Sequence, residues 1–140
     1  MKKSIIFTLL IVTSYSCSKF NIDEFPQKWQ LVKITTDQVP NAPVWTGTDM
    51  EYQEFYLLNS NGTFLKSREK DGSTTEASGS FVLKENEGEK YFELIFNFAD
   101  DPLIGSCNSG KEVLLIKTEK TIVGTWSYCD GPILEYQRVK

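Results

Sequence analysis

Apolar and polar residues alternate with a period of two over several stretches of the chain. The clearest stretch is Tyr91–Phe98, in which every second residue is large and apolar. A second stretch, Thr121–Tyr128, places Ile122, Trp126 and Tyr128 on the same face. This alternation is typical of β-strands with one buried face, and no window keeps a helical period. The pattern therefore predicts an all-β fold.

Turn sequences divide the pattern into strands. Asn61-Gly62 and Asp71-Gly72 favour tight hairpins, because glycine accepts a positive φ. Eight strands are predicted, near residues 28–36, 51–59, 63–70, 74–84, 90–98, 112–117, 121–128 and 133–139. Such a series predicts a closed barrel or a sandwich. Gly79 and Gly124 lie within strands, where we expect bulges or sharp bends.

The lengths of the connections favour an eight-stranded antiparallel up-and-down barrel. Successive connections of such a barrel alternate between its two ends. The long connections, 37–50 and 99–111, then lie at one end, and the tight turns close the other. Cys107 and Cys129 both fall at the end with the long loops.

The first sixteen residues have the features of an export signal. Lys2 and Lys3 precede the apolar run Ile5–Val12, which is too short to span a bilayer as a mature helix. Ser14-Tyr15-Ser16-Cys17 resembles the lipobox of bacterial lipoproteins. That resemblance implies that Cys17 is lipidated and becomes the mature N-terminus. An ordinary cleaved signal with an incidental Cys17 is the alternative.

The predicted organisation is a signal peptide over 1–16, a lipidated cysteine with a short tether over 17–25, and a barrel domain over 26–140. With Cys17 assigned to lipid, Cys107 and Cys129 remain, and an even number of cysteines in an exported protein favours a disulfide. Two free buried thiols are the alternative. The predicted location is the bacterial cell envelope, with the outer membrane favoured as the membrane that holds the anchor. Both the periplasmic and the surface face of that membrane are compatible with the sequence.

Composition excludes several classes of function. The 140-residue chain has no histidine, which excludes Ser-His-Asp and Cys-His catalysis and His-ligated metals. Its formal net charge of -4 gives no basic surface for nucleic acid. We expect neither a cofactor nor a metal. Carboxylate chemistry or Ca²⁺ binding by Asp100, Asp101, Asp130 and Asn108 is the weakest alternative, so the protein is predicted not to be an enzyme.

Residues 26–140 resemble the bacterial lipocalin-like domains, which are often small lipoproteins. The resemblance is carried by Lys28-Trp29-Gln30-Leu31, Asn61-Gly62-Thr63-Phe64, Cys129-Asp130-Gly131-Pro132 and Glu135-Tyr136-Gln137-Arg138. It implies that Trp29 plugs the closed end of the barrel and that Arg138 packs over its ring. In the family a glycine stands two residues before this tryptophan, whereas Gln27 stands there in this chain.

Two kinds of non-catalytic function are compatible with such a barrel. An open barrel would bind a small apolar ligand, with Phe96, Phe98, Trp126 and Tyr128 as walls and Trp45 as a lid on the first long loop. For the strand aromatics, ordinary core packing is the alternative. A barrel with a filled core would instead be a protein-interaction or envelope-structural module, with rim loops stiffened by the disulfide.

Overall fold

The computed structural model describes residues 20–36 and 39–140, and this part of the chain is all-β. Its strands are β1 Gln27–Thr35, β2 Val44–Thr46, β3 Gln53–Leu58, β4 Thr63–Lys70, β5 Ser73–Asn86, β6 Glu89–Phe96, β7 Lys111–Thr118, β8 Thr121–Gly124 and β9 Ile133–Val139. Two short 3-10 helices, η1 Gly47–Asp49 and η2 Trp126–Cys129, complete the regular structure. The predicted signal peptide and Cys17 lie outside the described residues.

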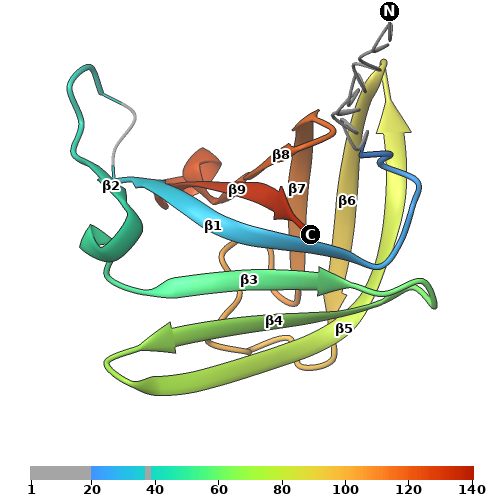
Figure 1. Cartoon of the computed structure of the whole chain (residues 1–140), viewed down its shortest axis with the longest axis horizontal. Coiled ribbons are helices and arrows are strands. Elements are labelled where there is room, and N and C mark those ends of the chain that lie inside the picture. Colours follow the sequence, from blue (N-terminus) through green and yellow to red (C-terminus); the bar gives the residue numbers. More distant parts are fainter. Residues whose placement is uncertain (1–19, 37–38) are drawn as a thin grey trace, which may run out of the picture.

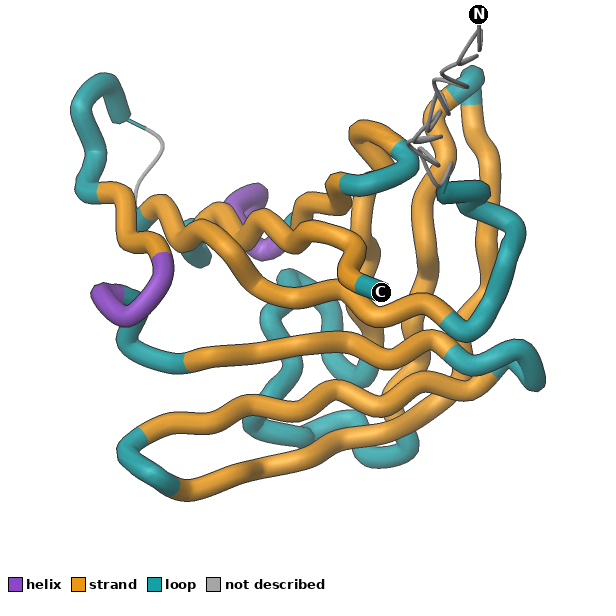
Figure 2. Tube along the Cα trace, viewed as in Figure 1, coloured by secondary structure: helices purple, strands orange, loops and turns teal. Residues whose placement is uncertain are grey.

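Eight strands form one closed antiparallel barrel (Figures 1 and 2). From β3 to β9 each strand pairs with the next along the chain. β1 closes the sheet, because it pairs with β3 on one side and with β9 on the other. The predicted eight-stranded up-and-down barrel is confirmed, and it is consistent with a lipocalin-like barrel.

The two ends of the barrel differ as the connection lengths predict. Tight β3–β4, β5–β6 and β7–β8 turns lie at one end, which we call the closed end. The long connections lie at the other, which we call the mouth. There a disulfide joins Cys107 to Cys129, with their Cα atoms 5.7 Å apart. The predicted pairing of these cysteines is confirmed.

The first long connection is more regular than expected. It contains β2 and η1, and β2 pairs with the mouth half of β1 through Lys33↔Thr46 and its neighbours. β3 pairs only with the other half of β1, from Gln27 to Gln30. β2 therefore lies beside the part of β1 that β3 does not reach.

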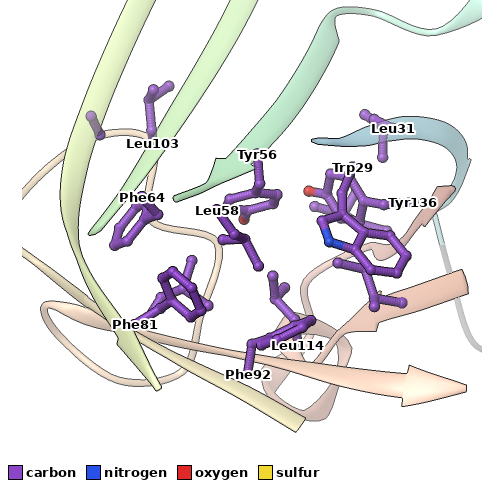
Figure 3. Packing of buried hydrophobic residues seen from close by; sticks show 14 of the residues in the cluster. Trp29, Leu31, Tyr56, Leu58, Phe64, Phe81, Phe92, Leu103, Leu114 and Tyr136 are labelled. Atoms are coloured by element: carbon purple, nitrogen blue, oxygen red, sulfur yellow. The ribbon is translucent and has the colours of Figure 1, made fainter. Parts of the chain in front are cut away.

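Large side chains fill the barrel interior (Figure 3). Trp29, Phe92 and Tyr136 have no exposed surface, and Tyr56 and Lys66 have at most 1%. The aromatic rings meet edge to face, as between Phe64 and Phe96, and between Tyr56 and Tyr136. Close packing of this kind is typical of a protein interior. The structure thus has a filled core.

Trp29 and Arg138, the two residues for which the resemblance implies a packing role, lie next to each other at the closed end of the barrel. They are paired residues on β1 and β9, and the Arg138 guanidinium carbon lies 5.9 Å from the centre of the Trp29 ring. The indole Nε1 donates a hydrogen bond to Gln27 Oε1 at 3.0 Å. Gln27 Nε2 in turn donates to the carbonyl oxygens of Ile22 and Glu24. Gln27 thus gives the buried indole its hydrogen-bond partner.

The structure shortens the tether that was predicted over residues 18–25. Ile22 is only 6% exposed, and the Phe25 ring packs 5.2 Å from that of Phe81. Residues 20–25 therefore belong to the folded domain, which begins before Pro26.

Two strands end earlier than the alternation predicts. β6 ends at Phe96 and β8 at Gly124, so Phe98 lies in a loop and Tyr128 in η2. Both side chains are on the surface rather than on the inner face. The register shifts lie between Leu31 and Lys33 and between Ile116 and Thr118, so the bulges that were one of the two expectations for Gly79 and Gly124 are not found there. Gly79 instead permits close packing, since a Cβ there would lie 1.9 Å from the Ile95 carbonyl oxygen.

Candidate functional site

A cavity of about 450 Å³ opens at the mouth of the barrel. β1, the segment from β2 to β3, and the connection from η2 to β9 supply its walls, which are Ile34, Thr36, Trp45, Asp49, Glu51, Tyr52, Asp130 and Pro132. Small-molecule sites in proteins commonly measure about 300–1,000 Å³. The mouth cavity is therefore large enough for a small ligand.

The lining of the mouth cavity is partly apolar and partly acidic. Trp45, which is 44% exposed, is the largest apolar side chain among the lining residues. Asp49, Glu51 and Asp130 supply carboxylates, and no lysine or arginine lies among the lining residues. Glu51 accepts a hydrogen bond from Lys70, which lowers the pKa of this carboxyl. In the described part of the chain, the carboxylates of Asp49 and Asp130 have no ion-pair partner.

Tyr52 separates the mouth cavity from charged groups below it. The Arg68 guanidinium carbon lies 4.1 Å from the centre of the Tyr52 ring. Arg68 Nε donates a hydrogen bond to Glu54 Oε2 at 2.6 Å. Burial, and next the charge of Glu54, raise the pKa of Tyr52 to about 12. Tyr52 is therefore a neutral wall of the cavity at physiological pH.

A buried cation lies in the middle of the barrel. Lys66 Nζ is 2.8 Å from Glu112 Oε1 and 3.5 Å from Glu54 Oε1, and it donates to the Leu103 carbonyl oxygen at 2.6 Å. The three charged side chains are at most 2% exposed. With Arg68, the group holds two cations and two carboxylates, so its charges balance. We call Glu54, Lys66, Arg68 and Glu112 the interior charge network.

Two tyrosines complete this network. Tyr56 donates its hydroxyl proton to Glu112 Oε2, and Tyr136 donates to Glu54 Oε1. Burial raises the pKa of both tyrosines well above the ordinary value, and the neighbouring carboxylates raise it further. Both hydroxyls therefore remain protonated donors. No buried side-chain nitrogen or oxygen of the described residues lacks a partner, so the network is satisfied without a ligand.

The loop between β6 and β7 covers part of the interior at the mouth. Leu103 is 3% exposed and packs in the core (Figure 3). The Gly105 amide donates a hydrogen bond to Glu112 Oε1. Trp126 lies against the same loop, since a Cβ on Gly105 would come within 2.9 Å of its ring. A Cβ on Gly131 would come within 2.3 Å of that ring. The disulfide then joins the loop to η2.

The five residues predicted to bind a ligand do not lie together in the structure. Trp45 lines the mouth cavity. Phe96 is buried against Phe64, and Trp126 packs between Gly105 and Gly131. Phe98 and Tyr128 are 71% and 74% exposed. The geometry thus places Trp45 at the cavity and gives Phe96 and Trp126 packing roles.

The interior charge network was missed because charged residues normally face solvent. A signal for it does exist in the sequence. Glu54 and Lys66 alternate with apolar residues on the inward faces of β3 and β4, and Glu112 does so on β7. Charged residues at inward positions on three strands predict a buried cluster, if the period of two is followed without regard to residue type.

One of the acidic residues considered for Ca²⁺, Asp101, has a structural use. The Asp101 carboxylate accepts the amide of Leu103 within the β6–β7 loop. Over residues 20–36 and 39–140, no group of three or more histidine, cysteine or acidic side chains could hold a metal ion. The same residues contain no helix long and apolar enough to cross a membrane.

Comparisons of the chain with protein-family models, with curated proteins and with solved structures gave no match. The function is therefore inferred from the barrel and its mouth.

Proposed function

We propose that the protein is a non-catalytic binding protein of the lipocalin-like type, tethered to a bacterial membrane through Cys17. It binds a small ligand with an apolar body at the mouth of the barrel. The observation that carries this proposal is the mouth cavity of about 450 Å³, with Trp45 on one wall.

The filled interior supports a site at the mouth rather than within the barrel. An eight-stranded barrel can be filled by side chains or can keep one small cavity. In this barrel, Trp29, Tyr56, Lys66 and Tyr136 occupy the interior with at most 1% exposure. A ligand could enter only by displacing groups whose hydrogen bonds are complete, and breaking those bonds is costly.

The acidic lining of the cavity limits the class of ligand. Asp49, Glu51 and Asp130 place negative charge around the opening, and a concave surface concentrates the field of such charges. Anions such as fatty acids are disfavoured by repulsion. A cationic head group is favoured, since it can also lie against the Trp45 ring. The ligand we expect has an apolar body and a positive or neutral end.

Binding at the mouth can be tested with two matched probes, octyltrimethylammonium and octanoate, at neutral pH and below their micellar concentrations. We expect the cation to bind, with a change in tryptophan fluorescence and a heat signal in calorimetry, and the anion to bind more weakly. Trp45→Leu should abolish binding of the cation. Tyr128→Leu is the control, because Tyr128 is exposed and does not line the mouth cavity. Failure of both probes to bind, or binding that survives Trp45→Leu, contradicts the proposal.

The tether has its own test. The apolar run before Cys17 and the small residues at Ser14 and Ser16 support export and lipidation. Cys17→Ser should move the protein from the membrane fraction to the soluble fraction of its host. Retention of this variant on membranes contradicts the lipid anchor, but it does not bear on the proposal that a ligand binds in the mouth cavity.

A second function, recognition of a partner protein by the mouth, has its own support. Phe98 and Tyr128 are large exposed side chains on the two segments that the disulfide joins, and exposed aromatic residues are common at interfaces. A photo-crosslinker at position 128 should then give a discrete adduct in intact cells, and one at Lys84 on the barrel wall should not. Equal labelling from both positions contradicts this function.

A further inference from the structure

The first described residues show where an N-terminal anchor leaves the barrel. Ile22 is buried, and Phe25 packs on Phe81 and Phe92, with ring centres 5.2 and 6.4 Å away. Gln27 binds the carbonyl oxygens of Ile22 and Glu24. Residues 20–25 are thereby held at the closed end, beside the β5–β6 and β7–β8 turns (Figure 1).

Phe20 is held at the same end by two cations. Lys120 Nζ lies 5.3 Å and the Arg138 guanidinium carbon 5.1 Å from the centre of its ring. Arg138 also donates to the carbonyl oxygens of Asn21 and Glu24, at 2.6 and 2.9 Å. The chain therefore enters the barrel beside the β7–β8 turn, far from the β4–β5 turn at the mouth (Figure 1).

The link from Cys17 to this fixed point is very short. Two residues, Ser18 and Lys19, stand between Cys17 and Phe20. Three residue steps span at most about 11 Å when fully extended. β7 alone has 8 residues, which at about 3.3 Å per residue corresponds to roughly 26 Å. The link is thus much shorter than the barrel is long.

From this geometry we infer that the closed end of the barrel faces the membrane and that the mouth faces away from it. The inference rests on the proposed lipid anchor at Cys17. The ligand then reaches the mouth cavity from the aqueous compartment or from a soluble partner, and not from the bilayer that holds the protein. The same orientation presents Phe98 and Tyr128 to partners in solution.

The closed end suits a position near lipid head groups without binding them strongly. Phe20 between Lys120 and Arg138 combines an aromatic ring with two cations, a combination found at membrane interfaces. Glu24 and Glu119 lie close enough to Arg138 to interact with its charge, and they offset the positive charge of the two cations. The lipid anchor therefore attaches the protein to the membrane, and the short link between Cys17 and Phe20 determines only how the barrel is oriented on it.

The orientation can be measured on the full lipidated protein in phosphatidylcholine vesicles that contain phosphatidylcholine spin-labelled on its head group. A fluorophore is attached to an introduced thiol, either Glu119→Cys at the closed end or Ser73→Cys beside the β4–β5 turn; both positions are exposed. We expect the spin label to quench the fluorophore at position 119 strongly and the one at position 73 not at all. Equal quenching, or stronger quenching at position 73, overturns the inference.

Two controls separate this inference from the anchor on which it rests. Cys17→Ser should leave the vesicles altogether; if it sediments with them, the lipid anchor fails and the orientation is not what the assay reports. A Gly-Ser insert of about ten residues after Ser18 adds roughly 17 Å of flexible reach. The protein with this insert should stay on the vesicles, and the difference in quenching between the fluorophores at positions 119 and 73 should disappear. A difference that persists with the insert contradicts the short link as its cause.

Discussion

Two groups of charged residues in this barrel have nearly the same geometry and opposite surroundings. In the interior, Lys66 lies 2.8 Å from Glu112 and 3.5 Å from Glu54. On the outer wall, Glu93 lies 2.8 Å from Lys84 and 3.3 Å from Lys111. The interior side chains are at most 2% exposed, whereas Lys84 and Lys111 are 44% and 39% exposed.

The comparison shows that distance alone does not determine what an ion pair contributes. Water solvates the outer charges whether or not they are paired, and salt screens them. The interior charges have lost their water, so each depends on its protein partners. Loss of one lysine should therefore lower the stability of the folded protein much more in the interior group than in the group on the outer wall.

The largest effect is expected for Lys66→Met, which removes the interior cation. Glu112 then keeps a buried charge with no cation beside it, and Glu54 keeps only Arg68. Loss of one partner from a buried ion pair typically costs about 3–5 kcal/mol. We expect the free energy of unfolding of the soluble domain, measured in urea, to fall by about this amount.

A second variant separates loss of charge balance from loss of volume. In Lys66→Met with Glu112→Gln, the unpaired charge is removed together with the cation. We expect the double variant to be more stable than the sum of the single effects implies, by a coupling energy of about 0.5–3 kcal/mol. Additive effects would mean that Lys66 acts through packing, and the contrast with the outer wall would be lost.

The tyrosine donors give a pH-dependent test of the interior. The pKa values of Tyr56 and Tyr136 are raised well above the ordinary value, mainly by burial. Above about pH 10 the unfolded chain releases these protons while the folded protein keeps them. The unfolded state then binds fewer protons, so stability is complete below pH 10 and falls above it, by about 1.4 kcal/mol per pH unit for each tyrosine.

Urea unfolding at stepped pH values measures this decline, and the ultraviolet absorbance of tyrosinate reports ionisation in the folded protein. Tyr56→Phe with Tyr136→Phe is the control, and it should reduce the alkaline decline to the part that the raised pKa of Tyr52 contributes. Ordinary titration of Tyr56 and Tyr136 in the folded protein would contradict the burial of these two hydroxyls.

The barrel was predictable because its local signals agree with its topology. Alternation gave the strands, and Asn61-Gly62 and Asp71-Gly72 marked turns that the structure contains, with positive φ at Gly62, Asp71 and Gly72. The disulfide followed from the even number of cysteines left after Cys17, and the connection lengths independently place Cys107 and Cys129 at the same end. These features depend on nearest neighbours along the chain or on the order of strands.

The site was less predictable because it depends on where the strands stop. Alternation continues past the end of β6 to Phe98 and past the end of β8 to Tyr128, although the backbone leaves the sheet before both. The β6–β7 loop must turn inward so that Leu103 and Gly105 reach Lys66 and Glu112. Such tertiary contacts override a local period. Trp45 was selected because a large aromatic residue on a loop needs a reason to be there, and the structure places it on β2, where it lines the mouth cavity.

The smallest effect is expected on the outer wall, for Lys84→Met. Glu93 keeps Lys111 and remains open to water, so the urea midpoint should not change measurably. The Glu93 carboxyl should nevertheless respond. Its pKa is lowered chiefly by the hydrogen bond from Lys84, and it should rise toward the ordinary value in the variant. A lowered pKa in the folded state stabilises the protein above the pKa of the unfolded chain, and this stability is lost as the pH falls. Any small difference between the variant and the unaltered protein should therefore be present at neutral pH and vanish in acid. Carboxyl NMR titration of Glu93 at low and high salt measures the shift, and a loss of stability at neutral pH comparable to that of Lys66→Met would mean that burial does not distinguish the two groups.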